Sequence, residues 1–248
     1  MVKGFRPHGL IAAVAAALAL AACGAPPVRH TAAAPAVTAA ATATATATAG
    51  AGSYRIDTAR SELRILVYRA GPLARWGHNH VMVNRSISGS VEWGGEASPS
   101  AFELTMSSAA FSVDDPTARL EEGDVFAADI PDDARAGTLR NMLSAAVLDA
   151  DEFPVVSVRS VAASAGPAGD RAGAWNGTVA IHIAGHDSLV VVPFTLTSES
   201  GRLCATGSTE LRQSALGLRP FSIMLGALQV QDELTVKFRI VADRGARD

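Results

Sequence analysis

Hydrophobic and polar residues alternate in period two along most of the chain after residue 61. In the first clear stretch, Leu63, Ile65 and Val67 share one face, and later stretches repeat the pattern. Strict alternation is typical of a strand with one buried and one solvated face. The pattern predicts strands over 62–68, 87–93, 102–107, 155–161, 174–183, 188–198, 202–211, 222–228 and 233–241, separated by turns rich in Gly, Pro, Ser and Asp.

One acidic interval interrupts this alternation. It runs from Asp114 to Asp133 and contains Pro116 and Pro131, which predicts an excursion over the surface. The spacing of its acids fits no EF-hand loop, so a solvated charged loop is favoured over a Ca²⁺ site. These acids are Asp114, Asp115, Glu121, Glu122, Asp124, Asp129, Asp132 and Asp133.

A single helix is predicted directly after the acidic interval, over 136–149. Leu139, Met142, Leu143, Ala146 and Val147 recur there at helical spacing, and the pattern ends before a Phe-Pro pair. Such a stripe packs one helix against the body. It would either close one end of the body or act as a lid.

About eight or nine antiparallel strands with one short packed helix predict an all-β sandwich or closed barrel. An eight-stranded barrel is either filled by its own side chains or holds one small ligand. Alternation does not distinguish these outcomes. Small residues at or beside alternating positions favour a hollow interior, namely Gly89, Ala205, Gly207 and Ala227.

The N-terminus has the features of an export signal. Lys3 and Arg6 precede an uncharged, mostly apolar run that ends at Ala22, which is shorter than the about 20 residues that span a bilayer. The boundary sequence Leu-Ala-Ala-Cys ending at Cys23 resembles the bacterial lipobox, in which the cysteine is acylated and becomes the new N-terminus. We therefore expect residues 1–22 to be a lipoprotein signal and Cys23 to be a lipid anchor.

The segment that follows Cys23 is predicted to be a disordered tether. Residues 23–53 consist largely of Ala, Thr, Pro and Gly, with almost no large side chain whose burial would offset the entropy of ordering. The folded domain is then expected to span 54–243, with a tail over 244–248. The location predicted from this arrangement is the cell envelope, on a membrane facing the periplasm or the cell exterior.

Charge and cysteine content narrow the possible functions. The formal net charge is −3 with no basic cluster, which argues against a nucleic-acid partner. If Cys23 is acylated, Cys204 is alone in the mature chain, so no intramolecular disulfide forms. Its alternating apolar surroundings favour a small buried residue over a reactive thiol.

Several motifs along the body resemble the YceI-like (polyisoprenoid-binding) family. They are Tyr54-Arg55-Ile56-Asp57 with Ser61-Glu62-Leu63, Asn141-Met142 through Phe153-Pro154, Trp175-Asn176-Gly177 to His186, Leu216-Gly217-Leu218-Arg219-Pro220, and Val230-Gln231-Asp232-Glu233-Leu234. The resemblance implies a lipocalin-like antiparallel β-barrel with an internal channel for an amphiphile such as a polyisoprenoid, and no chemistry. Two features depart from the family pattern, Arg75 to His80 and the acidic interval.

On this basis the expected function is to bind or carry a lipophilic chain, such as an isoprenoid or a fatty-acid-like ligand. Burial of a long hydrocarbon in a dry channel is favourable without any hydrogen bond. Strand parity predicts a channel lined by Leu63, Ile65, Val67, Phe102, Leu104, Met106 and Phe194. Trp76, His78 and His80 are expected near a mouth where a polar head group is met.

Two alternatives remain open on sequence alone. His78, His80, His182 and His186 would bind Zn²⁺ or Cu²⁺ if their two segments converged, giving a metal carrier or a metal-dependent hydrolase. No Gly-x-Ser-x-Gly elbow, phosphate loop or His-Glu-x-x-His motif supports any other enzyme, so no catalytic residue is assigned. The second alternative is a structural lipoprotein whose barrel is filled.

Overall fold

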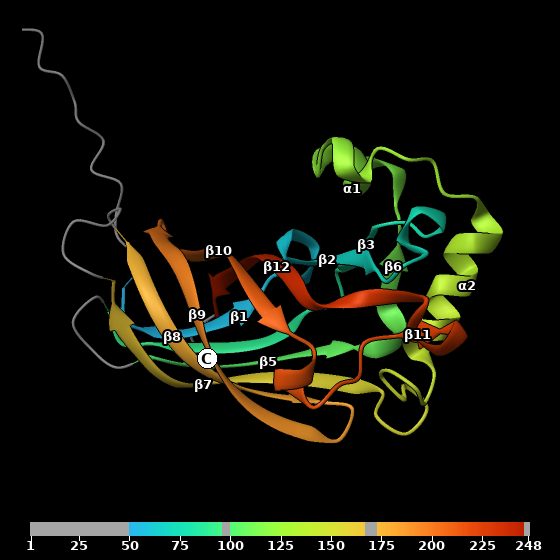
Figure 1. Cartoon of the computed structure of the whole chain (residues 1–248). Coiled ribbons are helices and arrows are strands. Elements are labelled where there is room, and N and C mark those ends of the chain that lie inside the picture. The colour runs from blue at the N-terminus through green and yellow to red at the C-terminus, as the bar shows by residue number, and fades with distance from the viewer. Residues whose placement is uncertain (1–49, 96–99, 167–172, 246–248) are drawn as a thin grey trace, which may run out of the picture. The chain divides into compact units, whose positions relative to one another are not determined.

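A closed ring of antiparallel strands forms the body of the computed structural model, which describes residues 50–95, 100–166 and 173–245 (Figure 1). Among these residues eight strands form the ring in the order β1-β4-β5-β7-β8-β9-β10-β12, and β12 pairs with β1 to close it. The strands are β1 (Gly52–Ile56), β4 (Ser88–Trp93), β5 (Ala101–Ser107), β7 (Val155–Ala165), β8 (Ala174–Ile183), β9 (His186–Glu199), β10 (Arg202–Arg212) and β12 (Leu228–Arg244). The predicted all-β barrel of about eight strands is confirmed.

The long strand β12 holds the ring together along two edges. One edge of β12 pairs with the whole length of β10, and the other edge pairs with β1 and with β2 (Glu62–Ala70). A short 3₁₀ turn, η1 (Thr58–Arg60), separates β1 from β2, and the Asp57 carboxylate caps it by accepting from the amide of Ala59 at 3.0 Å. From β2 the sheet extends sideways through β3 (His80–Asn84) to β6 (Phe111–Val113), which follows the turn η3 (Ser108–Ala110).

A second, smaller core lies outside the ring, against the outer face of β2 and β3. It is covered by α1 (Pro116–Glu121) and the turn η4 (Asp124–Phe126), which Figure 1 shows above the barrel. Asp115 caps α1 by accepting from the amide of Ala118, and Pro116 takes the first helical position, where it is well tolerated. The buried members of this outer core are Leu66, Val81, Val83, Ala118 and Phe126.

Ion pairs fix α1 to the barrel wall beside the outer core. The Arg64 guanidinium of β2 contacts Glu121 and Glu122, each at 2.9 Å. Lys237 of β12 also pairs with Glu122, whose side chain is almost fully buried. The acidic interval is therefore only partly the solvated loop that its composition predicted, because it contains a helix and buried carboxylates.

The helix predicted over 136–149 is present with different bounds. α2 (Asp132–Leu143) begins four residues earlier and ends earlier, and hydrogen-bonded turns follow it. Leu139 and Met142 pack against the apolar cluster formed by Val67, Met82, Phe111, Val113 and Leu234. α2 therefore lies across one end of the barrel, as Figure 1 shows.

The strand predicted over 222–228 is much shorter in the structure. β11 contains only Ser222–Ile223 and leads into the turn η6 (Met224–Gly226). Met224, Leu225 and Gly226 have φ angles of 52°, 55° and 88°, which are left-handed and incompatible with a strand. Two further 3₁₀ turns, η2 (Ala74–Trp76) and η5 (Ser214–Leu216), belong to loops of the barrel.

The N-terminal predictions fall mostly outside the described residues. The expected signal over 1–22 and the anchor Cys23 lie there, as does most of the expected tether over 23–53. β1 starts at Gly52, so the last two residues assigned to the tether belong to the barrel. Across residues 50–95, 100–166 and 173–245, no helix has the length and apolar character needed to cross a bilayer.

Candidate functional site

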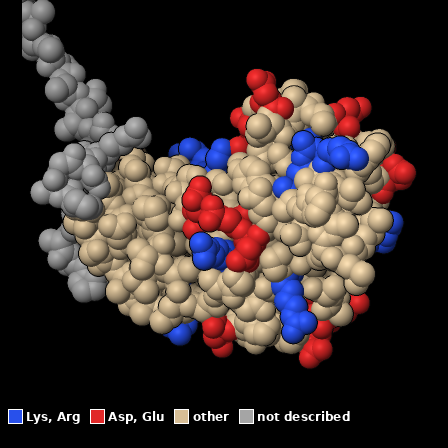
Figure 2. Space-filling view, in the orientation of Figure 1, with Lys and Arg blue, Asp and Glu red and all other residues tan. Residues whose placement is uncertain are grey.

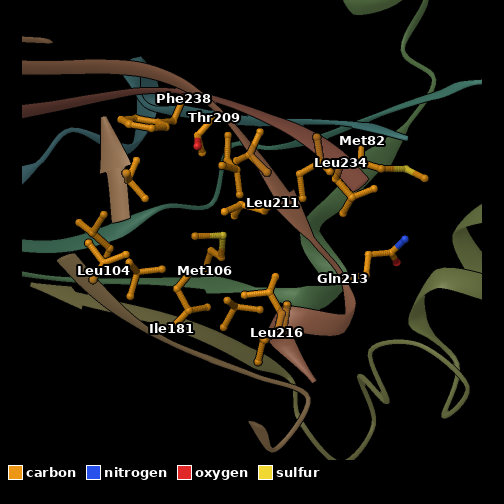
Figure 3. Close-up of a pocket in the computed structure, with 18 of the residues that line it drawn as sticks. Met82, Leu104, Met106, Ile181, Thr209, Leu211, Gln213, Leu216, Leu234 and Phe238 are labelled. Carbon is orange, nitrogen blue, oxygen red and sulfur yellow. The ribbon is translucent and has the colours of Figure 1, made fainter. Parts of the chain in front are cut away.

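The barrel encloses a cavity of about 1110 Å³. Its walls are the inward faces of the ring strands, with β2, β3 and α2 contributing at one end. Figure 3 shows Leu104, Met106 and Ile181 on one side of this space and Phe238 and Leu211 on the other. Some inward side chains of different walls pack together, but a cavity of this volume remains between them, so the interior is hollow and the filled-barrel alternative is wrong.

The residues predicted to line a channel all lie in the cavity wall. They come from β2, β5 and β9, where every second side chain points inward, and they are Leu63, Ile65, Val67, Phe102, Leu104, Met106 and Phe194. Alternation was sufficient to place them, because a closed ring has only one inner face. That these residues contact a ligand stays a prediction.

The interior is hollow, but most of the four small residues expected to create this space do not border it. A Cβ at Gly89 would lie 2.0 Å from the carbonyl oxygen of Glu103, and one at Gly207 would lie 2.4 Å from the Phe238 ring. These glycines admit neighbouring protein atoms and do not leave space for a ligand. Of the four small residues, only Ala205 lines the cavity.

Trp76, His78 and His80 line the cavity at the end that carries α2, and their position at a mouth that meets a polar head group stays a prediction. Trp76 is 70% exposed, and the Arg75 guanidinium lies 5.4 Å from the centre of its ring. Arg69, whose guanidinium donates to the carbonyl of Gly77 at 2.7 Å, holds this loop against β2.

A buried carboxylate positions His80, and sequence analysis missed it. Asp114 is 0% exposed and accepts from His80 Nδ1 at 2.6 Å, from the amide of Val81 at 2.9 Å, and from Arg119 of α1. Burial on its own would raise the pKa of Asp114, but the hydrogen bond and charge of His80, the Val81 amide and the charge of Arg119 together hold this pKa below its usual value.

The sequence contains a motif from which the Asp114–Arg119 pair could have been predicted. Asp115 followed by Pro116 is a helix N-terminus signature, and it would have placed Arg119 about one turn after Asp115, near Asp114. Arg119 also donates to the carbonyl oxygens of Asn79 at 2.8 Å and Ala128 at 3.2 Å. This one side chain therefore joins α1 to the segment that carries the mouth histidines.

His78 lies beside this network with its ring exposed, 6.4 Å from the ring of His80. Partial burial lowers the pKa of His78, and the positive charges of His80, Arg119 and Arg69 lower it further, while Asp114 acts in the opposite direction. His78 is therefore biased toward its neutral form, which both donates and accepts hydrogen bonds.

Further polar side chains lie in the wall at the same end. Thr138 and Asn141 come from α2, and Gln213 and Gln229 come from the barrel strands and their loops. Gln213 is buried, and its amide nitrogen donates to the carbonyl of Gln231 at 2.7 Å. Ser100, Ser160 and Ser164 also line the wall, away from the α2 end, so polar side chains occur toward both ends of a cavity whose lining is mostly apolar.

The four histidines considered for a metal site do not converge. His182 lies outside the cavity wall and pairs with Asp187 at 3.0 Å, and His186 packs against Gly217. Within the described part of the chain, no group of three or more His, Cys, Asp or Glu residues is arranged to hold a metal. The metal site built on His78, His80, His182 and His186 is therefore not supported by the structure.

Cys204 was expected to be a small buried residue, and it is only half-buried. It is a free thiol in β10, next to the inward-facing Leu203 and Ala205. Because successive side chains of a strand point to opposite faces, Cys204 lies on the outside of the barrel. It takes no part in the cavity.

Comparison with known proteins places this architecture in a family. The family model described as "YceI-like domain" matches residues 54–242. No curated protein matches the sequence.

Two solved structures share the fold. BcnA of Burkholderia cenocepacia superposes with a TM-score of 0.55 at 19% identity, covering 75% of this chain and 98% of that one. A polyisoprenoid binding domain from Saccharophagus degradans, implicated in plant cell wall breakdown, superposes with a TM-score of 0.51 at 11% identity, covering 77% of this chain and 98% of that one.

Proposed function

The chain belongs to the YceI-like domain family, and on that premise we propose that its barrel binds the hydrocarbon chain of a lipophilic amphiphile, such as a polyisoprenoid. The observation that carries this proposal is the cavity of about 1110 Å³ with its mostly apolar lining. The structural neighbour from Saccharophagus degradans, which is a polyisoprenoid binding domain, supports the ligand class.

The size and lining of the cavity favour a hydrocarbon over water. At about 30 Å³ per molecule, this space would take tens of waters, which would find few hydrogen-bond partners among Leu, Ile, Val, Met and Phe side chains. A buried methylene gains about 0.8 kcal/mol, so ten of them contribute about 8 kcal/mol. Such binding needs neither a metal nor a reacting group, and the proposed role is non-enzymatic.

The polar head of the ligand is proposed to lie at the α2 end, near Trp76, His78 and His80. The wall at this end carries Arg69 and the two imidazoles, and the Asp114 carboxylate fixes the ring of His80 there.

We further propose that the protein is an exported lipoprotein held to a membrane of the cell envelope by acyl groups on Cys23. The support is the signal-like segment 1–22 and the lipobox-like sequence that ends at Cys23. Metabolic labelling with a tagged fatty acid tests it. The parent chain should incorporate label, and the Cys23→Ser variant should not.

Native mass spectrometry tests ligand binding. The protein purified from cells should carry a mass above that of its polypeptide, released by organic solvent, and the emptied protein should take up an added polyisoprenol. A protein that shows its polypeptide mass alone and takes up no polyisoprenol would contradict the proposal.

A matched pair of variants on β10 sharpens the test. Thr209→Trp introduces an indole into the cavity, whereas Ser208→Trp adds the same group to the outer face one residue earlier. We expect the first variant to lose at least tenfold in polyisoprenol uptake and the second to retain it. Circular dichroism should show the same strand content in both.

A further inference from the structure

Four apolar side chains protrude at the mouth of the cavity and form what we call the apolar rim. It consists of Trp76 of η2, Ile223 of β11, and Met224 and Leu225 of η6. Met224 is 66% exposed, Leu225 is fully exposed, and Trp76 and Ile223 are also exposed. Apolar groups of this size gathered at one place on a surface mark an interaction site.

The two loops that carry the rim are fixed to each other. The amide of Leu73, just before η2, donates to the carbonyl of Ala227, just after η6, at 2.8 Å. A Cβ at Gly71 would lie 2.7 Å from the carbonyl oxygens of Gly226 and Ala227, so this approach requires glycine. The rim is therefore one surface built from two distant parts of the chain.

The backbone of η6 is unfavourable for the residues that occupy it. Met224 and Leu225 both have positive φ angles, of 52° and 55°, a conformation that glycine or asparagine adopts more readily. The chain thus holds two large apolar side chains in solvent on a strained backbone. Strain of this kind is concentrated at functional sites.

The rim is continuous with the cavity. Trp76 and Ile223 line the cavity as well as the surface, and Leu228 continues the apolar wall inward. A hydrocarbon leaving the barrel here would pass from the cavity wall directly onto the rim. The partner best suited to this surface is therefore a lipid bilayer, which can exchange a hydrocarbon chain with the cavity.

The charge around the rim selects the kind of lipid surface. Neither 63–91 nor 211–231, the two segments that carry the rim, contains any Asp or Glu, although the whole chain is net acidic. They supply Arg69, Arg75, Arg212 and Arg219, and Figure 2 shows both basic and acidic groups around an uncharged area at the α2 end. The acids of α2 at this end include Asp132, which is paired with Arg135.

We propose that the apolar rim inserts into the surface of a bilayer that contains anionic lipid, so that the mouth of the barrel opens onto the membrane. Arginine side chains near the rim contact lipid phosphates, while the indole of Trp76 occupies the headgroup level, which tryptophan favours. This docking goes beyond the proposed ligand binding and can be measured with an empty barrel.

Vesicle co-sedimentation tests the docking. The chain from residue 23 onward is used with Cys23→Ser, so that neither the predicted signal nor an acyl group contributes. We expect it to bind vesicles of phosphatidylethanolamine and phosphatidylglycerol at least tenfold more tightly than vesicles of phosphatidylcholine alone. Equal binding to both would overturn the assigned preference for anionic lipid.

The rim variant is Met224→Asn with Leu225→Asn, two residues outside the cavity wall, since asparagine tolerates the positive φ angles. Its matched control is Leu189→Asn with Val191→Asn on β9, where the two side chains are 67% and 61% exposed but lie outside the cavity wall. We expect the rim variant to lose at least tenfold in binding to anionic vesicles and the control to bind as the parent does.

Two further measurements distinguish the remaining outcomes. Equal loss in the rim variant and the control would overturn the proposal, as would a parent chain that self-associates through the rim in light scattering and binds no vesicle. Uptake of polyisoprenol from detergent is measured separately. If the rim variant keeps this uptake but loses vesicle binding, docking is a separate step from ligand binding. If the parent chain takes up no polyisoprenol but binds vesicles, the proposed ligand is wrong and the docking stands.

Discussion

Strands β2 and β3 carry apolar residues on both faces, and the two faces have opposite surroundings. On the outer face, Leu66, Val81 and Val83 are buried against α1 and η4, where Phe126 is 1% exposed. On the inner face, Ile65 and Met82 belong to the cluster that α2 covers and also line the cavity. The same strands therefore separate an outer core from an inner apolar layer that borders a cavity.

This difference shows where the fold obtains its rigidity. The outer core packs side chains against one another and is joined to the wall by Arg64, Arg119 and their carboxylate partners. The inner face contributes further apolar clusters that also border the cavity. The outer core therefore adds stability at a place where its packing does not occupy the cavity.

The largest effect is expected from truncating the aromatic side chain of the outer core. Phe126→Ala should lower the free energy of unfolding by about 3–5 kcal/mol, because it leaves a void among close-packed side chains. Phe102→Ala, which enlarges a cavity that is already present, should cost less than half as much. Urea unfolding measures both, and equal losses would contradict the contrast between the two cores.

Removing the buried carboxylate should have a slightly smaller effect. Asp114→Ala leaves the Arg119 guanidinium buried without its partner and should cost about 3 kcal/mol in unfolding free energy. The double variant with Arg119→Met removes the unpaired charge and should recover part of this loss in the same urea experiment. No recovery would show that the two residues act independently.

The same carboxylate gives a pH dependence with a defined sign. The folded-state pKa of Asp114 is depressed, so its contribution to stability is fully present above the unfolded-state pKa of about 4 and is lost as pH falls through the lower folded value. Urea midpoints measured from pH 6 down to pH 2 should therefore fall more steeply in the parent than in Asp114→Ala.

Enlarging a side chain in the outer core and in the cavity wall should give a smaller difference in stability than truncation does. Ala118→Leu overfills the outer core and should cost about 1–3 kcal/mol, whereas Ala205→Leu projects into free space and should change stability by less than about 1 kcal/mol. Thermal unfolding of both variants measures this. A larger loss for Ala205→Leu than for Ala118→Leu would mean that the cavity is not free to accept side chains.

The smallest effect is expected at the exposed mouth. The pKa of His78 is lowered on folding, so protonation favours the unfolded chain, and stability should decline slightly as pH falls from about 6.5 through the folded-state value. His78→Gln should remove this decline. An NMR titration of the His78 ring should give a midpoint below 6.5, and a midpoint above it would contradict the assigned surroundings.

Alternation in the sequence was enough to predict most ring strands and which side chains point inward. β8 was predicted with its observed bounds, and Leu63, Phe102 and Phe194 lie in the wall as expected. Hollowness could not be predicted in the same way, because period two indicates direction and contains no information on whether opposite side chains meet. A small residue does not indicate a cavity either, because the space beside Gly207 is filled by the ring of Phe238.

The parts that sequence analysis missed depend on contacts between distant segments. Asp114 was taken for part of a solvated acidic loop, and it is buried because Arg119, His80 and the Val81 amide all converge on it. The strand expected over 222–228 contains apolar residues typical of β-structure, but the loop contact between Leu73 and Ala227 accompanies a left-handed turn instead. Neither outcome follows from local composition.

The ring is closed by pairing between its first and last strands, so three earlier strands have an unpaired edge until the end of the chain is in place. β12 is 17 residues long and is the partner of β1, β2 and β10. A product that stops before Leu228 would present three exposed strand edges, each a template for pairing with another chain. The ring cannot close until synthesis reaches this seam, and the last strand then covers the three edges that would otherwise be open to other chains.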